Sequence, residues 1–158
     1  MTPAPLTALG LSECRLERFG TAILPVEDMQ PAGPEEPRLR FGGDNLRYYL
    51  MRLQRRPPVV ASMTRHLHAT QCLGSADARP WWIALAEPGL SPGALDHTNV
   101  QLVKVMPGEG LKLHQGTWHA GPFFEEASAL FFNLELSDTN QNDHNCQQLA
   151  IALRLMLI

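Results

Sequence analysis

Residues 99–121 read NVQLVKVMPGEGLKLHQGTWHAG and contain three short strand patterns separated by turns. In NVQLVKVM (99–106) the apolar residues Val100, Leu102 and Val105 are interrupted by polar residues, which is close to the alternation of a half-buried strand. PGEG (107–110) predicts a sharp turn, and LKLHQGTWHAG (111–121) predicts two short strands around a glycine turn. The stretch therefore predicts β structure rather than helix.

The same pattern continues on both sides of this stretch. WWIALA (81–86) is a buried-strand pattern, and further strands are expected at 46–53, 59–63 and 128–136, with 65–73 in extended form. Short strands joined by Gly and Pro turns, with little helix, predict a small antiparallel barrel or sandwich whose mouth can hold one small ligand.

The length of 158 residues predicts a single domain spanning 1–158, with residues 1–15 as a loose N-terminal arm. The apolar tail CQQLAIALRLMLI (146–158) fits either a helix or a strand. Such a tail needs a groove or a partner to cover it, and a homodimer is expected.

Charge and composition indicate which kinds of partner the protein does not bind. Lys plus Arg total 13 and Asp plus Glu total 16, so a net charge of −3 provides no basic field for nucleic acid. No apolar run is long enough to span a membrane, and the N-terminus does not resemble a secretory signal. We therefore expect a cytoplasmic protein that binds neither membranes nor nucleic acid.

The three cysteines, Cys14, Cys72 and Cys146, are far apart and form no CxxC pair, which is typical of free thiols in a reducing compartment. The alternative is a thiol nucleophile at Cys72, close in sequence to His66 and His68.

Four histidines fall into two pairs. His66 and His68 form an H-x-H motif, and on a strand both rings would point to one face, as a divalent metal site requires. His114 and His119 are an odd number of residues apart, so they reach one site only if the turn at Gly116 redirects the chain. The alternative for the H-x-H motif is a chance occurrence on a β pattern, and the alternative for His119, beside Trp118, is a packed ring with one hydrogen bond.

The sequence gives weaker support to other polar residues as members of a functional site. Gln71 could point inward after an irregular residue, and Glu135 is the carboxylate candidate, although its position between two leucines also fits the solvated side. Loop histidines and the arginine cluster are expected to be solvated: His97, His144, Arg52, Arg55 and Arg56.

KLHQGTWHAGPFF (112–124) resembles the ureidoglycolate lyase family of cupin-type β-barrels, which carries a His, a short turn and then x-W-H before an apolar run. In this sequence these positions are His114, Gly116, Trp118 and His119. Upstream, ERFG (17–20) resembles the family's opening element. TRHLHATQCLG (64–74) resembles its R-H-x-x-x-T-Q segment, at Arg65, His66, Thr70 and Gln71.

Three departures separate this chain from the family pattern. Ala120 stands where bacterial lyases usually have a second histidine, Ala76-Asp77-Ala78 stands where they tend to have Lys-Gly, and His68 replaces an aliphatic residue. The resemblance therefore implies the cupin-like antiparallel barrel or jelly roll more strongly than it implies the substrate.

What the resemblance implies is a carbon–nitrogen lyase that cleaves ureidoglycolate, a small carboxylate, to glyoxylate and urea. The implied catalytic residues are His119, His66 and His114, and the implied substrate-binding residues are Gln71, Trp118 and Lys112. A divalent metal (Ni, Mn, Zn or Fe) would be held by His66, His68 and His119. Two alternatives stay open: a cupin module that binds a small carboxylate or metal without catalysis, and a cupin isomerase or decarboxylase.

Overall fold

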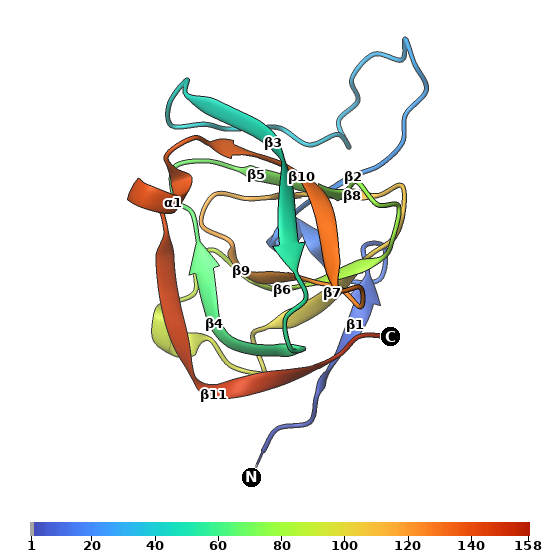
Figure 1. Cartoon of the computed structure of the whole chain (residues 1–158). Coiled ribbons are helices and arrows are strands. Elements are labelled where there is room, and N and C mark those ends of the chain that lie inside the picture. The colour runs from blue at the N-terminus through green and yellow to red at the C-terminus, as the bar shows by residue number, and fades with distance from the viewer. Residues whose placement is uncertain (1) are drawn as a thin grey trace.

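Two layers of β-strands make up the protein in a computed structural model that describes residues 2–158 (Figure 1). The first layer is a closed barrel in the order β1-β11-β4-β9-β6-β7, and the second is a five-stranded sheet in the order β2-β8-β5-β10-β3. The barrel strands are β1 (Leu6–Gly10), β4 (Val59–Arg65), β6 (Trp81–Ala86), β7 (Gln101–Val105), β9 (Trp118–Phe123) and β11 (Asn145–Met156). The sheet strands are β2 (Gly20–Ile23), β3 (Leu46–Gln54), β5 (Gln71–Ser75), β8 (Gly110–Leu113) and β10 (Ser128–Leu136).

Helix is confined, within the described residues, to two 3-10 turns at Leu16–Arg18 and Pro92–Ala94 and the short α1 (Thr139–Asn142). The predicted cupin-like all-β fold with little helix is confirmed. No helix in the described part of the chain is long and apolar enough to cross a membrane.

Strand β6 explains how the layers pack, because both of its faces are buried. Trp81, Ile83 and Leu85 belong to an apolar core shared with the five-stranded sheet, and the alternate residues Trp82 and Ala84 belong to a second core with residues of β4, β9 and β11. A continuous apolar run such as WWIALA is what a strand covered on both sides requires.

The N-terminal prediction is wrong. Residues 6–10 are not a loose arm: β1 pairs in parallel with β7, at Ala8↔Leu102, and with β11, at Leu6↔Leu155. The barrel is therefore antiparallel except where β1 closes it. Both partner strands are distant in sequence, so no hairpin signal marks this pairing.

The C-terminal tail forms a strand rather than a helix, since β11 pairs antiparallel with β4.

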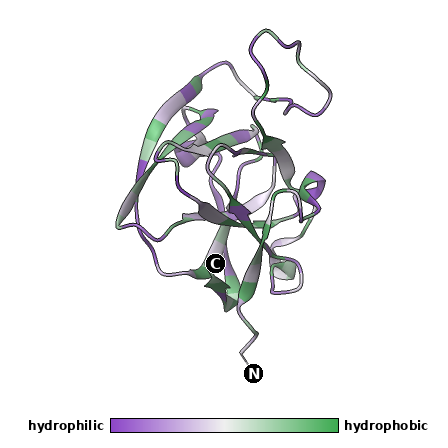
Figure 2. Cartoon of the chain, turned by 90° about the vertical axis from the view of Figure 1, so that its right-hand side faces the viewer, coloured by the Kyte–Doolittle hydropathy of each residue, from purple (hydrophilic) through white to green (hydrophobic). Residues whose placement is uncertain are grey.

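Between β2 and β3 runs a long segment, 24–45, which extends from the body of the molecule in Figures 1 and 2. Its end is tied back by an isolated bridge between Phe41 and Ala69. This bridge positions the residues that precede β3.

Candidate active site

A cavity of about 240 Å³ lies between the barrel and the five-stranded sheet, lined by residues of β3, β4, β5, β9 and β10. Its polar lining comes from both layers and from the segments that follow β3, β4 and α1. The polar and charged residues that line it are Tyr49, Arg56, Ser62, Thr64, His66, Gln71, His119, Asn133, Glu135, Asn140 and His144.

His66 is the first residue after β4 and is buried. Its Nδ1 lies 2.6 Å from the main-chain oxygen of Asp143. Because a carbonyl oxygen only accepts, Nδ1 must carry the hydrogen, which leaves Nε2 as the ring nitrogen available to a ligand. Among the described residues, Nε2 has no hydrogen-bond partner.

His119 on β9 has the same arrangement. Its Nδ1–H donates to the main-chain oxygen of Thr117 at 3.2 Å, which again leaves the lone pair on Nε2. The two ring centroids, of His66 and His119, are 5.0 Å apart. Burial, and next the neighbouring His66, lower the pKa of His119 to about 3, so the ring is neutral at physiological pH.

His144 joins these two rings, which corrects the expectation that it would be a solvated loop residue. Its ring centroid is 5.9 Å from that of His66, and it lines the same cavity, although much of the residue remains exposed. The segment after α1 turns the ring back over the cavity, which residue spacing alone did not indicate.

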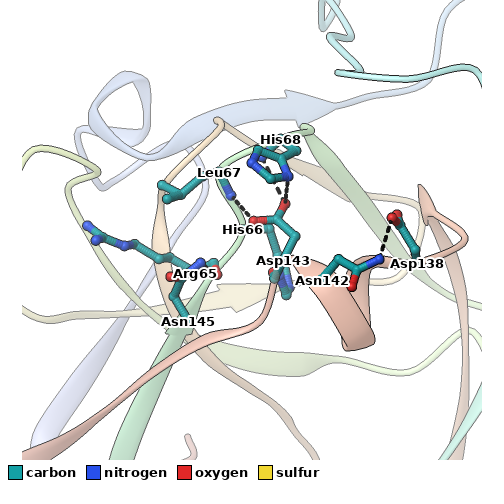
Figure 3. A network of polar contacts seen from close by, with 8 residues as sticks. All are labelled: Arg65, His66, Leu67, His68, Asp138, Asn142, Asp143 and Asn145. Carbon is teal, nitrogen blue, oxygen red and sulfur yellow. Dashed lines mark hydrogen bonds and ion pairs between the residues drawn. The ribbon is translucent and has the colours of Figure 1, made fainter.

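His68 does not reach the cavity, and the predicted strand geometry of the H-x-H motif is wrong. β4 ends at Arg65, and the next segment is a loop in which the two-residue period no longer applies. The carboxylate of Asp143 fixes this loop by accepting from the main-chain N–H groups of Leu67 and His68, each at 2.8 Å (Figure 3). The His68 ring is exposed, with Nδ1 3.9 Å from Oδ2 of Asp143.

The predicted metal triad is consequently not assembled. His66 and His119 meet, but His68 points elsewhere, and the described residues include no cluster of three His, Cys, Asp or Glu side chains arranged to hold a metal ion.

Opposite the histidines, four side chains of the five-stranded sheet form a buried hydrogen-bonded network. The carboxylate of Glu135 accepts from the Tyr49 hydroxyl at 3.0 Å and from Nε2 of Gln71 at 3.3 Å. Nε2 of Gln71 also donates to Oδ1 of Asn133 at 3.1 Å, and Nδ2 of Asn133 donates to the Tyr49 oxygen at 3.1 Å. Glu135 is therefore an inward residue, not a solvated one.

This network leaves one acceptor free. The amide oxygen of Gln71 is buried and has no partner among the described residues. Burial, and next the Glu135 charge, raise the pKa of Tyr49, so its hydroxyl keeps its proton and remains a donor. The cavity therefore presents a free acceptor and a carboxylate on one wall and imidazole lone pairs on the other.

One cation also lines the cavity. Arg56 follows β3, and its guanidinium lies 5.6 Å from the ring centroid of Phe123. Burial lowers the pKa of Arg56 from its ordinary value, but an arginine remains charged at any physiological pH.

Three predicted site residues lie outside this cavity. His114 and Lys112 bond to each other, Nζ to Nδ1 at 3.0 Å, and line a different cavity. Trp118 is buried in the second core, where its Nε1–H donates to the main-chain oxygen of Leu90 at 3.1 Å. The glycine turn, with Gly116 at φ +83°, does redirect the chain: His114 and His119 both line a small crevice with His66 and Gln71, but only His119 lines the main cavity.

Cys72 is not a nucleophile of this site. It pairs with Lys112 across β5 and β8, does not line the cavity, and has a thiol whose pKa burial raises to about 11. All three cysteines are free, as predicted.

Sequence reasoning missed Tyr49 and Asn133 as site residues. On β10, the inward positions Ala129 and Phe131 are apolar, so an Asn at the next inward position, 133, is the signal that could have been used. Tyr49 had no such signal, because tyrosine is common on strands.

Comparison with known proteins supports the resemblance. The family model described as "Ureidoglycolate lyase" matches residues 41–157, and a comparison with curated proteins gives no match. The match includes all of the cavity-lining residues and the C-terminal strand, but not ERFG (17–20). Since it covers most of the 158 residues, the chain belongs to the ureidoglycolate lyase family.

Proposed function

We propose that this protein cleaves the C–N bond of ureidoglycolate, or of a closely related small hydroxy acid, in the cavity between the two layers. The observation that carries the proposal is the pair of imidazoles, His66 and His119, whose Nε2 atoms share a cavity with Glu135 and the unpartnered oxygen of Gln71. Family membership supports a ureidoglycolate-processing enzyme at the level of the family.

The cavity offers complementary groups for each end of such a substrate. Ureidoglycolate carries a carboxylate and a hydroxyl on one carbon, and a urea nitrogen on the same carbon. Arg56 is the lining cation that can pair with the carboxylate. The free amide oxygen of Gln71 and the Glu135 carboxylate are acceptors for the urea N–H groups.

Cleavage requires one proton to leave the hydroxyl and one to reach the departing nitrogen. A lone pair at Nε2 of His119 takes the hydroxyl proton, the C–O bond becomes a carbonyl as the C–N bond breaks, and the nitrogen receives a proton to give urea. A protonated His119 is a strong acid because of its low pKa, so it returns the proton readily. The substrate carboxylate, bound nearby, would raise that pKa and make the ring a better base.

His66 assists His119 in this scheme by accepting a hydrogen bond. Its Nδ1–H is engaged by Asp143, so Nε2 is oriented as an acceptor for the substrate hydroxyl or for a water. This scheme includes no metal, because the three histidines predicted as ligands, His66, His68 and His119, do not come together. Elemental analysis for Ni, Mn, Zn and Fe tests directly whether the purified protein carries one.

The test is urea release from ureidoglycolate by the purified chain and two variants. His119→Ala should lower turnover by about 10²–10⁴-fold, the usual cost of losing a general acid or base, and should keep the fold. His97→Ala, at an exposed histidine that does not line the cavity, is the matched control and should leave turnover unchanged. A His119→Ala variant as active as the parent would refute the assignment.

A second candidate is a binding module without catalysis. Ala120 lines the cavity at the position where bacterial family members usually have a second histidine, so one polar group is missing there. In that case the parent protein would bind glyoxylate but release no urea, and Arg56→Gln would weaken the binding while His119→Ala would not.

A further inference from the structure

A second cavity, of about 380 Å³, lies beside β8 and shares no lining residue with the first. It is lined by Arg38, Arg40, Thr70, Lys112, His114 and Gln115. Three of these residues are cations and none is a carboxylate. The chain as a whole has a net charge of −3, so this concentration of positive charge is local.

Lys112 is a buried cation, only 5% exposed. Its Nζ donates to Nδ1 of His114 at 3.0 Å, and the other ring nitrogen, Nε2–H, donates to the main-chain oxygen of Glu17 at 3.0 Å. His114 is therefore held as a neutral acceptor, and it does not compensate the charge of Lys112.

No anion of the described residues compensates the charge of Lys112 either. Among the described residues, Lys112 forms no ion pair. Its cross-strand neighbour Cys72 is a neutral thiol, because burial raises the thiol pKa to about 11. Burial first, and also the charge of Arg40, lower the pKa of Lys112. A buried charge without a counterion is costly, and an anion in the cavity would remove that cost.

Arg40 is fixed beside Lys112 by its own main chain. Its N–H donates to Oγ1 of Thr70 at 3.0 Å, and its carbonyl oxygen accepts from the Thr70 main-chain N–H at 2.8 Å and from the Thr70 hydroxyl at 3.1 Å. Thr70 is itself buried.

The backbone at Gly42, two residues after Arg40, is also held in place. The N–H of Gly42 donates to the main-chain oxygen of His68 at 2.6 Å, and a Cβ at Gly42 would lie 2.8 Å from that oxygen. The bridge Phe41↔Ala69 lies between these two contacts. The backbone beside the cavity is thus built against the loop that follows His66, and the cavity is not the chance gap of a free loop.

We propose that the cavity formed by Arg38, Arg40 and Lys112 binds a small doubly charged oxyanion, a phosphate group or a dicarboxylate. Two planar guanidinium groups suit bidentate contact with such an anion, and the buried ammonium supplies a point charge at the bottom of the cavity. The proposal does not depend on the function of the first cavity.

Isothermal titration calorimetry at physiological ionic strength tests this with two probes, inorganic phosphate and malonate. We expect saturable binding of one molecule per chain, and the tighter probe identifies the anion class. Lys112→Met, which keeps the length of the stem without the charge, and Arg40→Gln should each weaken binding at least about tenfold. Arg52→Gln removes an exposed arginine of β3 that does not line the cavity, and should have no effect.

Two further variants separate the cavities. Arg56→Gln and His119→Ala change the first cavity and should leave anion binding unchanged, whatever they do to urea release. Thermal unfolding shows whether Lys112→Met is folded. If it is not, anion binding is compared between the parent and the variants Arg38→Gln and Arg40→Gln. Absence of saturable binding by both probes, or equal binding by the folded parent and the folded Lys112 or Arg40 variant, would overturn the proposal.

Discussion

His66 and Asp143 are joined by a hydrogen bond of 2.6 Å from the imidazole Nδ1–H to the main-chain oxygen. The carboxylate of the same aspartate accepts from the two main-chain N–H groups that follow His66, those of Leu67 and His68. Asp143 thus fixes both the ring and the loop that carries it, and links the cavity to the segment between α1 and β11. Its side chain is a positioning group that does not line the cavity.

Removing that carboxylate should loosen the His66 loop. Asp143→Ala leaves two main-chain N–H groups without their acceptor, and we expect a loss of about 1–3 kcal/mol in the free energy of unfolding. Turnover should also fall, because His66 is no longer held in one orientation. Urea denaturation and the urea-release assay measure the two effects.

The control is Asp138→Ala in the same segment. The Asp138 carboxylate accepts from the exposed side chain of Asn142 at 3.0 Å, so its removal should change stability and turnover little. Equal effects of the two substitutions would contradict a specific role for Asp143.

The low pKa of His119 predicts how stability depends on pH. The folded state protonates this ring only near pH 3, whereas an unfolded histidine protonates near pH 6.5. Between these values the unfolded state binds more protons, so the contribution of His119 to stability is complete above about pH 6.5 and is lost as the pH falls, by at most about 1.4 kcal/mol per pH unit.

His119→Gln should therefore flatten the pH dependence of the free energy of unfolding below neutrality, even if it lowers stability at every pH. Urea denaturation across a pH series measures the slopes for the parent, for His119→Gln and for the exposed control His97→Gln. Parallel pH profiles for the parent and His119→Gln would show that the ring is not shielded from protonation.

The Tyr49 hydroxyl is expected to contribute to stability through the buried network. Tyr49→Phe keeps the ring but removes the donor to Glu135 and the acceptor for Asn133, and should cost about 0.5–1.5 kcal/mol. The neighbouring Tyr48 is 68% exposed, so Tyr48→Phe should be nearly neutral while keeping its stacking on Phe132. Chemical denaturation of both variants checks the difference, and a loss of equal size in both would show that the network adds nothing.

The fold could be predicted from sequence where local patterns decide the structure. WWIALA and SALFFNLEL are dense in β-forming residues and are bounded by turns, and they form β6 and β10 as expected. The pairing of β1 depends on partners far along the chain, which no local pattern encodes, so residues 1–15 looked like an arm.

The resemblance predicted only part of the site, because the motif residues His114 and Trp118 do not line the cavity. His66, Gln71 and His119 line the cavity, and each belongs to a family motif. His68 was placed there by assuming that the strand continues past Arg65, although it ends there. His144 and Tyr49 were missed because tertiary packing, not spacing, turns their side chains inward.

The closure of the barrel by β1 can be tested with two leucines of that strand. Leu6 packs against the second core, whereas Leu9 is 36% exposed. Because Leu6 is partly buried, Leu6→Ala should cost about 1–2 kcal/mol, less than a fully buried leucine loses, and Leu9→Ala should stay within about 0.5 kcal/mol of the parent. If residues 1–15 were instead a loose arm, both substitutions would be neutral in urea denaturation, because neither side chain would lose a packed environment.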